Sequence, residues 1–220
     1  MANHTYSLRL QTQQGFSLIE LSMVLIIIGL LLAGVLKGTE LVTQARLRNI
    51  STSFDGLMAA YQTYQERYRT PPGDDPYAAS RWPSTASNGS GDRVICGAYH
   101  GGSGGQTCSS GTIESTQLWQ HLRSAGLLPG SGSNNPDHPG NGIFGIQYGG
   151  YGFSRHVLCA NNLPATIASS IDRQLDDGLA NQGDIRAAAQ SGNGDISTST
   201  PTSGIYLEES NTPYVLCRSL

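Results

Sequence analysis

The stretch Gly15-Phe16-Ser17-Leu18-Ile19-Glu20 opens an apolar run that ends near Leu36. Glu20 is the only charged residue in this run before Lys37. A lone carboxylate costs about 2.5–3.5 kcal/mol at the centre of a membrane helix, and less near its end. Such a residue needs a partner, so its presence indicates that the segment does more than anchor the chain.

The apolar run from Phe16 to Leu36 has 21 residues, enough to span a hydrocarbon core of about 30 Å. An ordinary secretory signal would be removed after this run, and Ala33-Gly34 is the alternative site of that kind. A cut between Gly15 and Phe16 would instead keep the run as the mature N-terminus. It would also leave an ammonium on Phe16, which could neutralise Glu20 of the same or a neighbouring subunit.

A polar leader of residues 1–15, the Gly15-Phe16 junction and a glutamate at the fifth position after the cut form one motif. This motif resembles the cleavage and methylation signal of type IV pilins and type II secretion pseudopilins. The resemblance implies that prepilin peptidase cleaves after Gly15 and methylates the nitrogen of Phe16. It also implies that Glu20 acts in assembly.

The same resemblance implies partners and places in the cell. The partners are further copies of the chain in a helical homo-polymer, prepilin peptidase, and an inner-membrane assembly platform with its ATPase. The precursor is expected in the inner membrane as a single-pass protein. The assembled filament is expected in the periplasm or at the cell surface.

Beyond Lys37 an apolar stripe continues at helical spacing. The stripe consists of Leu47, Ile50, Phe54, Leu57, Tyr61, Tyr64 and Tyr68. Pro71-Pro72-Gly73 ends the pattern. We therefore expect one helix over 16–68, with the membrane span at about 16–36 and the remainder packed along one side onto a globular domain.

Residues 69–220 are expected to form that globular domain. Two short helices are predicted, from Ser115 to Ala125 and from Pro164 to about Asp176. Strands are predicted at 143–148, 156–160, 204–208 and 213–218. The expected fold class is α+β and pilin-like, in which the long N-terminal helix packs on a small antiparallel sheet.

Four cysteines, all after the membrane segment, favour two disulfides in an exported domain. They are Cys96, Cys108, Cys159 and Cys217. Three connectivities are open. The preferred one joins Cys96 to Cys108 around a glycine-rich loop, and Cys159 to Cys217, which ties the C-terminus to an inner strand.

Acidic residues gather at Asp74-Asp75, Asp172, Asp176-Asp177 and Asp184. Loop carboxylates can bind Ca²⁺, but the spacing does not match an EF-hand, and turn formation accounts for Asp-Asp-Gly. No cofactor is expected, with calcium kept open as the alternative. The histidines are scattered singly and no nucleophile motif is present, so an enzyme is disfavoured. The formal net charge of −3 offers no sign of a nucleic-acid groove.

The function expected from these observations is that of a structural subunit of a type IV pilus-like filament. A type II secretion pseudopilin is the first alternative. A minor tip subunit that acts as an adhesin or binding module is the alternative of another class. The sequence leaves the choice among the three open.

Overall fold

The computed structural model describes residues 15–102, 104–109, 111–196 and 199–220. Most of the expected leader, residues 1–14, lies outside them. Helix α1 runs from Leu18 to Tyr68, close to the predicted bounds. The chain divides into two compact units, residues 1–44 and 45–220, so that α1 contributes its first part to one unit and its second part to the other.

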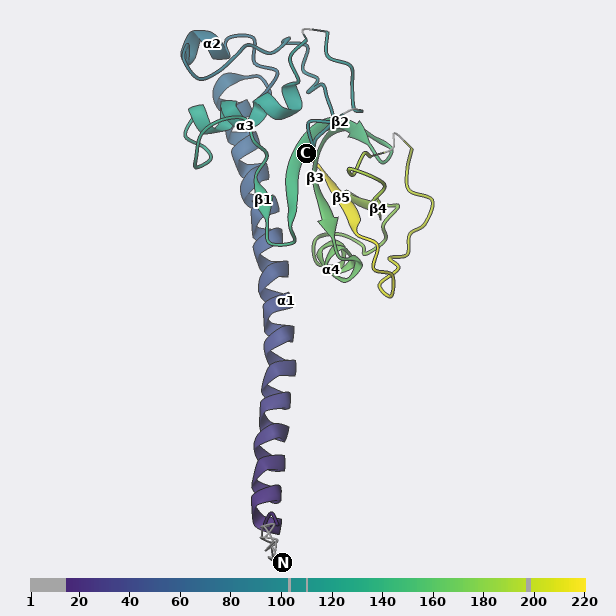
Figure 1. Ribbon diagram of the computed structural model, residues 1–220. Coiled ribbons are helices and arrows are strands. Elements are labelled where there is room, and N and C mark those ends of the chain that lie inside the picture. Colours follow the sequence, from purple (N-terminus) through teal and green to yellow (C-terminus); the bar gives the residue numbers. More distant parts are fainter. Residues whose placement is uncertain (1–14, 103, 110, 197–198) are drawn as a thin grey trace, which may run out of the picture. The chain divides into compact units, whose positions relative to one another are not determined.

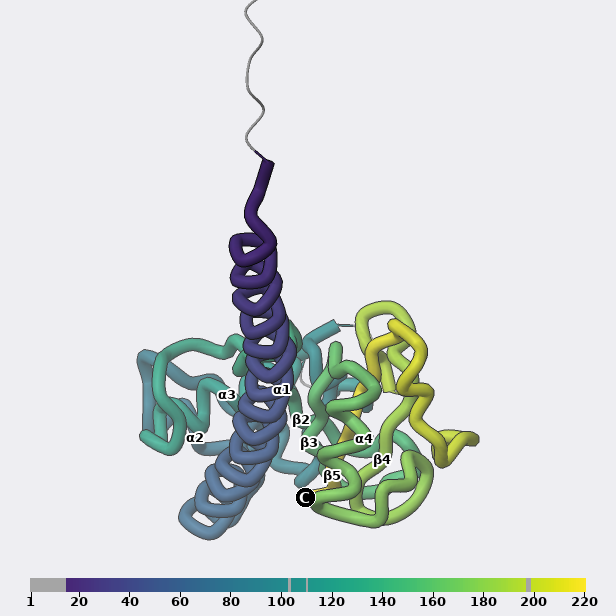
Figure 2. Tube along the Cα trace, turned by 90° about the horizontal axis from the view of Figure 1, so that it is seen from below, coloured from purple at the N-terminus to yellow at the C-terminus, as the bar shows by residue number. Residues whose placement is uncertain are grey.

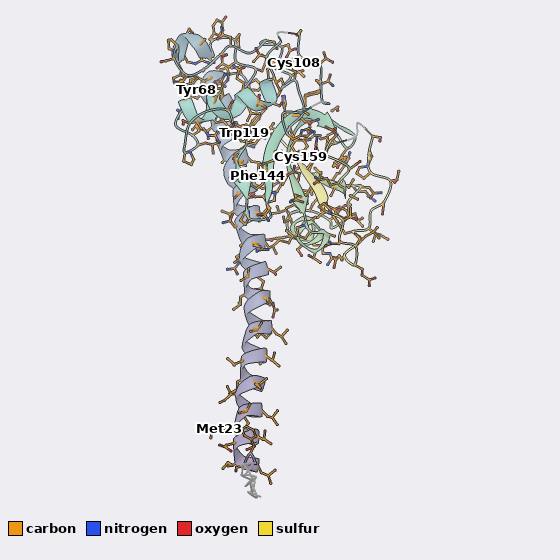
Figure 3. All side chains as sticks on the ribbon, in the orientation of Figure 1. Met23, Tyr68, Cys108, Trp119, Phe144 and Cys159 are labelled. Atoms are coloured by element: carbon orange, nitrogen blue, oxygen red, sulfur yellow. A yellow bond between two sulfur atoms is a disulfide. The ribbon has the colours of Figure 1, made fainter. Side chains whose placement is uncertain are left out.

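In the first unit, α1 is apolar and exposed on all sides. It is long and apolar enough to cross a membrane. Side chains such as Leu18 and Leu36 are 88% and 72% exposed, and Figure 3 shows Met23 on this part of the helix. An apolar helix surface of this kind is unfavourable in water. It is typical of a helix that is surrounded by lipid or by other helices.

In the second unit, the predicted stripe is confirmed as the buried face of α1. Ile50, Phe54 and Tyr64 are completely buried, and the ring of Phe54 meets Phe144 edge-on with centroids 5.2 Å apart. After Tyr68 the chain leaves the helix through Arg69, whose φ of 62° is left-handed, and prolines follow at 71 and 72. The helix therefore ends where the sequence predicts.

Five antiparallel strands form one sheet in the order β1-β2-β3-β5-β4 (Figure 1). The central pairs join β2 to β3 and β3 to β5, and β1 and β4 are the edges. The strand bounds are Asp137–His138 for β1, Gly142–Gly150 for β2, Phe153–Leu163 for β3, Ile185–Ala189 for β4 and Tyr214–Ser219 for β5.

The two faces of the sheet bury different clusters, because side chains alternate along a strand. Leu158, Ala160 and Leu216 belong to the main core with α1 and the shorter helices. Val157, Cys159 and Cys217 face the other way into a smaller cluster that includes Tyr99 and Tyr151. One face of the sheet is therefore covered by helices and the other by loops.

Three short helices complete the fold: α2 (Ala78–Arg81), α3 (Glu114–Ser124) and α4 (Ala165–Leu175). Helices α3 and α4 lie where the sequence predicts them. Figure 2, seen from below, shows α4 beside β4 and β5.

The prediction of a strand at 204–208 is wrong. This segment forms turns, in which Ile205 and Leu207 are exposed while the hydroxyl of Tyr206 donates to Asp172. The sheet edge is taken by β4, which the sequence analysis did not identify. Its run of alanines carries little strand propensity, and its pairing with β5 is decided by contacts from elsewhere in the chain.

Candidate functional site: the N-terminal motif and its surroundings

Helix α1 begins with a reciprocal pair of caps. The hydroxyl of Ser17 accepts the N–H of Ile19 at 3.3 Å, and the carboxylate of Glu20 accepts the N–H of Ser17 at 3.0 Å. This is the capping-box arrangement, in which two otherwise unpaired N–H groups at a helix start are satisfied. The acid also interacts favourably with the positive end of the helix dipole.

The sequence analysis missed this role of Glu20, although the signal was present as serine followed three residues later by glutamate. Gly15, Phe16 and Glu20 are all exposed, so the Gly15-Phe16 junction is accessible in the first unit. In this precursor, Glu20 is therefore bound within its own helix start and remains accessible.

The structure joins Cys96 to Cys108 and Cys159 to Cys217, which is the preferred connectivity. Cys159 and Cys217 lie directly opposite each other on β3 and β5. The first bond closes the glycine-rich loop, and the second links two neighbouring strands on the loop-covered face of the sheet.

Asp74 forms a cluster with Asp92 and Glu114, in which Asp74 and Glu114 are buried and Asp92 is exposed. The carboxylate of Asp74 accepts the N–H groups of Gly91, Asp92 and Arg93. Burial raises the pKa of Asp74, and these hydrogen bonds oppose the rise. The neighbouring Asp75 has different partners: its carboxylate pairs with Arg81 and accepts a hydrogen bond from the hydroxyl of Tyr64. Asp74 therefore holds the loop 90–93 in place.

A second group brings Asp172, Asp176 and Asp177 together. The carboxylate of Asp172 accepts the Tyr206 hydroxyl and the Gly178 N–H, while Asp176 accepts the N–H of Ile185 at 2.8 Å. Asp184 is not part of this group, since it accepts the hydroxyl of Ser219. Each of these contacts holds a turn or a chain segment in place. The expectation of no cofactor stays a prediction, with calcium at either cluster as its alternative.

With this geometry in hand, comparison with known families gives one finding. Residues 10–36 match the prokaryotic N-terminal methylation motif. The match begins in the leader and ends at Leu36, so it spans the Gly15-Phe16 junction, the capped helix start and the apolar part of α1. No curated protein and no solved structure matches the chain significantly.

The motif and the exposed apolar helix together define the class: the N-terminal segment is a type IV pilin-like prepilin signal. The chain therefore carries the N-terminal segment that is typical of pilin- and pseudopilin-type precursors, on a helix that is apolar enough to anchor it in a membrane. The α+β fold, with a long N-terminal helix and an open antiparallel sheet, is consistent with a pilin-like protein. These features indicate a structural protein rather than an enzyme.

Proposed function

We propose that the processed chain is a structural subunit of a type IV pilus-like filament and polymerises through its N-terminal helix. The observation that carries the proposal is the position of Glu20. It is the only acid in the apolar part of α1, it lies four residues after Phe16, and it falls within the methylation motif.

The physical argument concerns the charge of Glu20 in a water-poor surrounding. In the precursor its carboxylate is satisfied by the N–H of Ser17, which is a neutral donor. Cleavage after Gly15 would create a positive charge at Phe16, and a charged partner is worth much more in a low dielectric. Between packed helices, only one axial offset brings the carboxylate of one subunit to the ammonium of the next. Glu20 would thus set the register of the polymer.

On this proposal, prepilin peptidase cleaves the leader and methylates Phe16. The single-pass subunit waits in the inner membrane until an assembly platform with its ATPase adds it to the filament. The assembled form would lie in the periplasm or at the cell surface. A type II secretion pseudopilus is the alternative for the same chemistry, since the N-terminal motif is common to both.

The test is Glu20→Gln, in which the amide oxygen can still accept the Ser17 N–H while the charge is lost. We expect the processed subunit to accumulate in the membrane and filaments to disappear from sheared preparations imaged by electron microscopy. Glu40→Gln is the matched control, because among the described residues the Glu40 side chain pairs only with the exposed Lys37, and its filaments should be normal. Normal filaments from Glu20→Gln would overturn the proposal.

A further inference from the structure

The second unit exposes a group of large apolar side chains on one part of its surface. Among the described residues of this unit, the large apolar side chains that are exposed are Tyr77, Ile113, Leu179, Ile205 and Leu207. The last three lie together, because the N–H of Ala180 donates to the carbonyl of Gly204 and brings Leu179 beside the segment that follows. We call Leu179, Ile205 and Leu207 the apolar ridge. Apolar side chains that gather on a surface mark an interaction site, whereas scattered ones do not.

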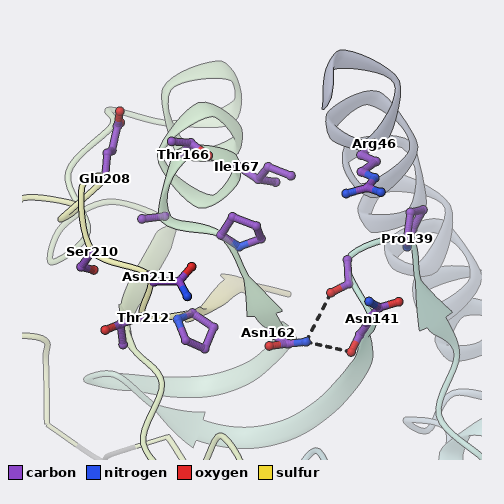
Figure 4. Close-up of a pocket in the computed structure, with 14 residues that line it drawn as sticks. Arg46, Pro139, Asn141, Asn162, Thr166, Ile167, Glu208, Ser210, Asn211 and Thr212 are labelled. Carbon is purple, nitrogen blue, oxygen red and sulfur yellow. Dashed lines mark hydrogen bonds between the residues drawn. The ribbon is translucent and has the colours of Figure 1, made fainter. Parts of the chain in front are cut away.

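The backbone of the ridge is held in place by buried contacts. The hydroxyl of Tyr206 donates to Asp172 at 2.6 Å, and the N–H of Leu207 donates to the hydroxyl of Tyr214. Figure 4 shows the next residue, Glu208, beside α4, and its carboxylate pairs with a side chain of that helix. The ridge is therefore pre-organised, so little entropy would be lost when it makes a contact.

Acidic side chains accompany the ridge. Asp177, Glu208 and Glu209 are exposed and lie within two residues of it in the sequence. Glu208 is paired with Arg173 at 3.2 Å, whereas Glu209 has no hydrogen-bond or ion-pair partner among the residues that the structure describes. Three acids against one cation give this surface a negative charge, and Glu209 is available to a partner.

A second surface of the same unit has the complementary character. A hollow of about 340 Å³ is lined by residues of α1 and β1 and by the loop that follows α3. Most of its large side chains are apolar, namely Leu57, Leu127, Leu128, Pro136 and Phe144. Leu127 and Leu128 are only half-buried, so an apolar side chain from outside would find apolar contacts here.

Two arginines hold the loop that carries Leu127 and Leu128. Arg67 donates to the carbonyl of Ala125 at 3.4 Å, and Arg123 donates to carbonyls of residues 129–134. Within the described part of the chain, neither guanidinium group pairs with an acid. Asp137 is the one carboxylate in the lining of the hollow, so the positive charge is in excess. We call the two arginines and the apolar lining the arginine hollow.

The ridge and the hollow lie at opposite edges of the sheet. Ile205 and Leu207 adjoin β4, since they line a common depression with Ala187, Ala188 and Ala189. The arginine hollow includes residues of β1, and β1 and β4 are the two edge strands (Figure 1). One copy therefore cannot place its ridge in its own hollow. Contacts between two different surfaces of identical chains leave one of each free, so they repeat and form rings or helical filaments.

We propose that the apolar ridge of one copy docks in the arginine hollow of the next copy in the filament. Ile205 and Leu207 would meet the apolar lining, and Glu209 would face the arginines. Charge complementarity favours a second copy as the occupant, because the acidic ridge attracts the basic hollow while two ridges or two hollows repel each other. The inference rests on the proposed function and deepens it, since it names the surfaces through which the second units meet.

The test is photo-crosslinking in cells that make the full processed subunit. A benzophenone amino acid replaces Leu207, and cross-linked peptides are mapped by mass spectrometry in the membrane fraction and in sheared filaments. We expect a product of two copies that joins position 207 to the loop with Leu127 and Leu128. The same amino acid at Tyr77, which is similarly exposed but outside both surfaces, is the matched control. It should give at least about tenfold less of this product.

Charge reversal tests the complementarity. Glu209→Arg should lower the yield of the cross-link at least about tenfold, because like charges would then face each other. Glu209→Gln removes the charge without reversing it and should have a smaller effect. Arg67→Glu combined with Glu209→Arg should recover much of the yield, since every copy carries both surfaces. Thermal unfolding checks that each variant folds as the parent does.

Three results would overturn the inference. They are the absence of a cross-link between copies in both fractions, a cross-link from position 207 that leads to another protein or to a second ridge, and an undiminished yield in Glu209→Arg. The filament proposal is tested separately by Glu20→Gln. Filaments without the ridge-to-hollow product would leave that proposal intact, whereas the product in membranes of cells without filaments would support the contact and count against polymerisation.

Discussion

The ring of His121 accepts the backbone N–H of Gly73 at Nδ1, over 2.9 Å and across 48 positions of sequence. The other ring nitrogen, Nε2, lies 2.8 Å from the carbonyl oxygen of Ser87 and donates to it. A ring that accepts at one nitrogen and donates at the other must be neutral. His156 is arranged in the same way, because its Nε2 accepts the N–H of Ile95. Both rings link distant segments only while they stay unprotonated.

This arrangement predicts a loss of stability in acid. Burial lowers the pKa of His121 and of His156 from 6.5 to about 4. Between these pH values the unfolded chain binds protons that the folded chain does not. The contribution of the two neutral histidines to the free energy of unfolding is therefore complete above pH 6.5 and is lost as pH falls towards 4. For the fully buried His121 the loss is about 2 kcal/mol at pH 5 relative to pH 8.

The buried carboxyls have the opposite effect on the pH dependence of stability, because burial raises the pKa of Asp74, Glu114 and Asp172. A direct comparison therefore isolates the histidine: the free energy of unfolding of the parent and of His121→Gln, each at pH 8 and pH 5. We expect the variant to lose less stability than the parent when the pH is lowered from 8 to 5. Equal losses would show that His121 does not titrate on unfolding.

The two disulfides are expected to differ in their contribution. Cys159 and Cys217 are 58 positions apart and fully buried, whereas Cys96 and Cys108 are 12 apart. Closure of the longer loop removes more unfolded-state entropy, about 4 kcal/mol against about 3. Replacing Cys159 and Cys217 by alanine should lower the melting temperature more than replacing Cys96 and Cys108. Non-reducing peptide mapping checks the pairing itself, and the reverse order of stability would contradict this account.

Phe54 is predicted to be the most sensitive position on the buried stripe of α1. Its side chain is completely buried and meets Phe144 edge-on. Phe54→Ala should cost about 3–5 kcal/mol through lost burial and the cavity that remains. Gln62→Ala, on the exposed side of the same helix, serves as the control and should change stability by less than about 0.5 kcal/mol. Urea unfolding in detergent measures both, and a cost at Phe54 no larger than that at Gln62 would count against this packing.

Processing should leave a mature chain that starts at Phe16 with a methylated nitrogen, as intact mass and N-terminal sequencing would show. Gly15→Leu places a bulky side chain at the junction and should leave the leader attached. Ala33→Leu changes the alternative cleavage site and should not alter processing. A mature chain that starts after Ala33 would contradict the assignment.

Removal of divalent cations is expected to leave stability unchanged. The carboxylates of Asp74, Asp172 and Asp176 already accept backbone N–H groups within their own loops. Thermal unfolding with EDTA and with added calcium should therefore coincide. A calcium-dependent rise in melting temperature that Asp172→Asn abolishes would instead establish a calcium site.

The features that the sequence determined by itself are those that depend on near neighbours. The apolar run from Phe16, the stripe from Leu47 to Tyr68 and the stop at Pro71 are local patterns of a helix. Each could be identified because residues three or four apart share a face. The capping box at Ser17 and Glu20 was equally local, and the same rule would have found it.

The tertiary structure alone decided which distant segments meet. Strand β4 forms because β5 offers it an edge, while 204–208, with a better strand pattern, is held in turns by the bond from Tyr206 to Asp172. The register shift in β3 between Ala160 and Leu163, and the link from His121 to Gly73, likewise depend on how remote segments meet. No local propensity encodes such pairings, because their free energy arises only when the whole core closes around them.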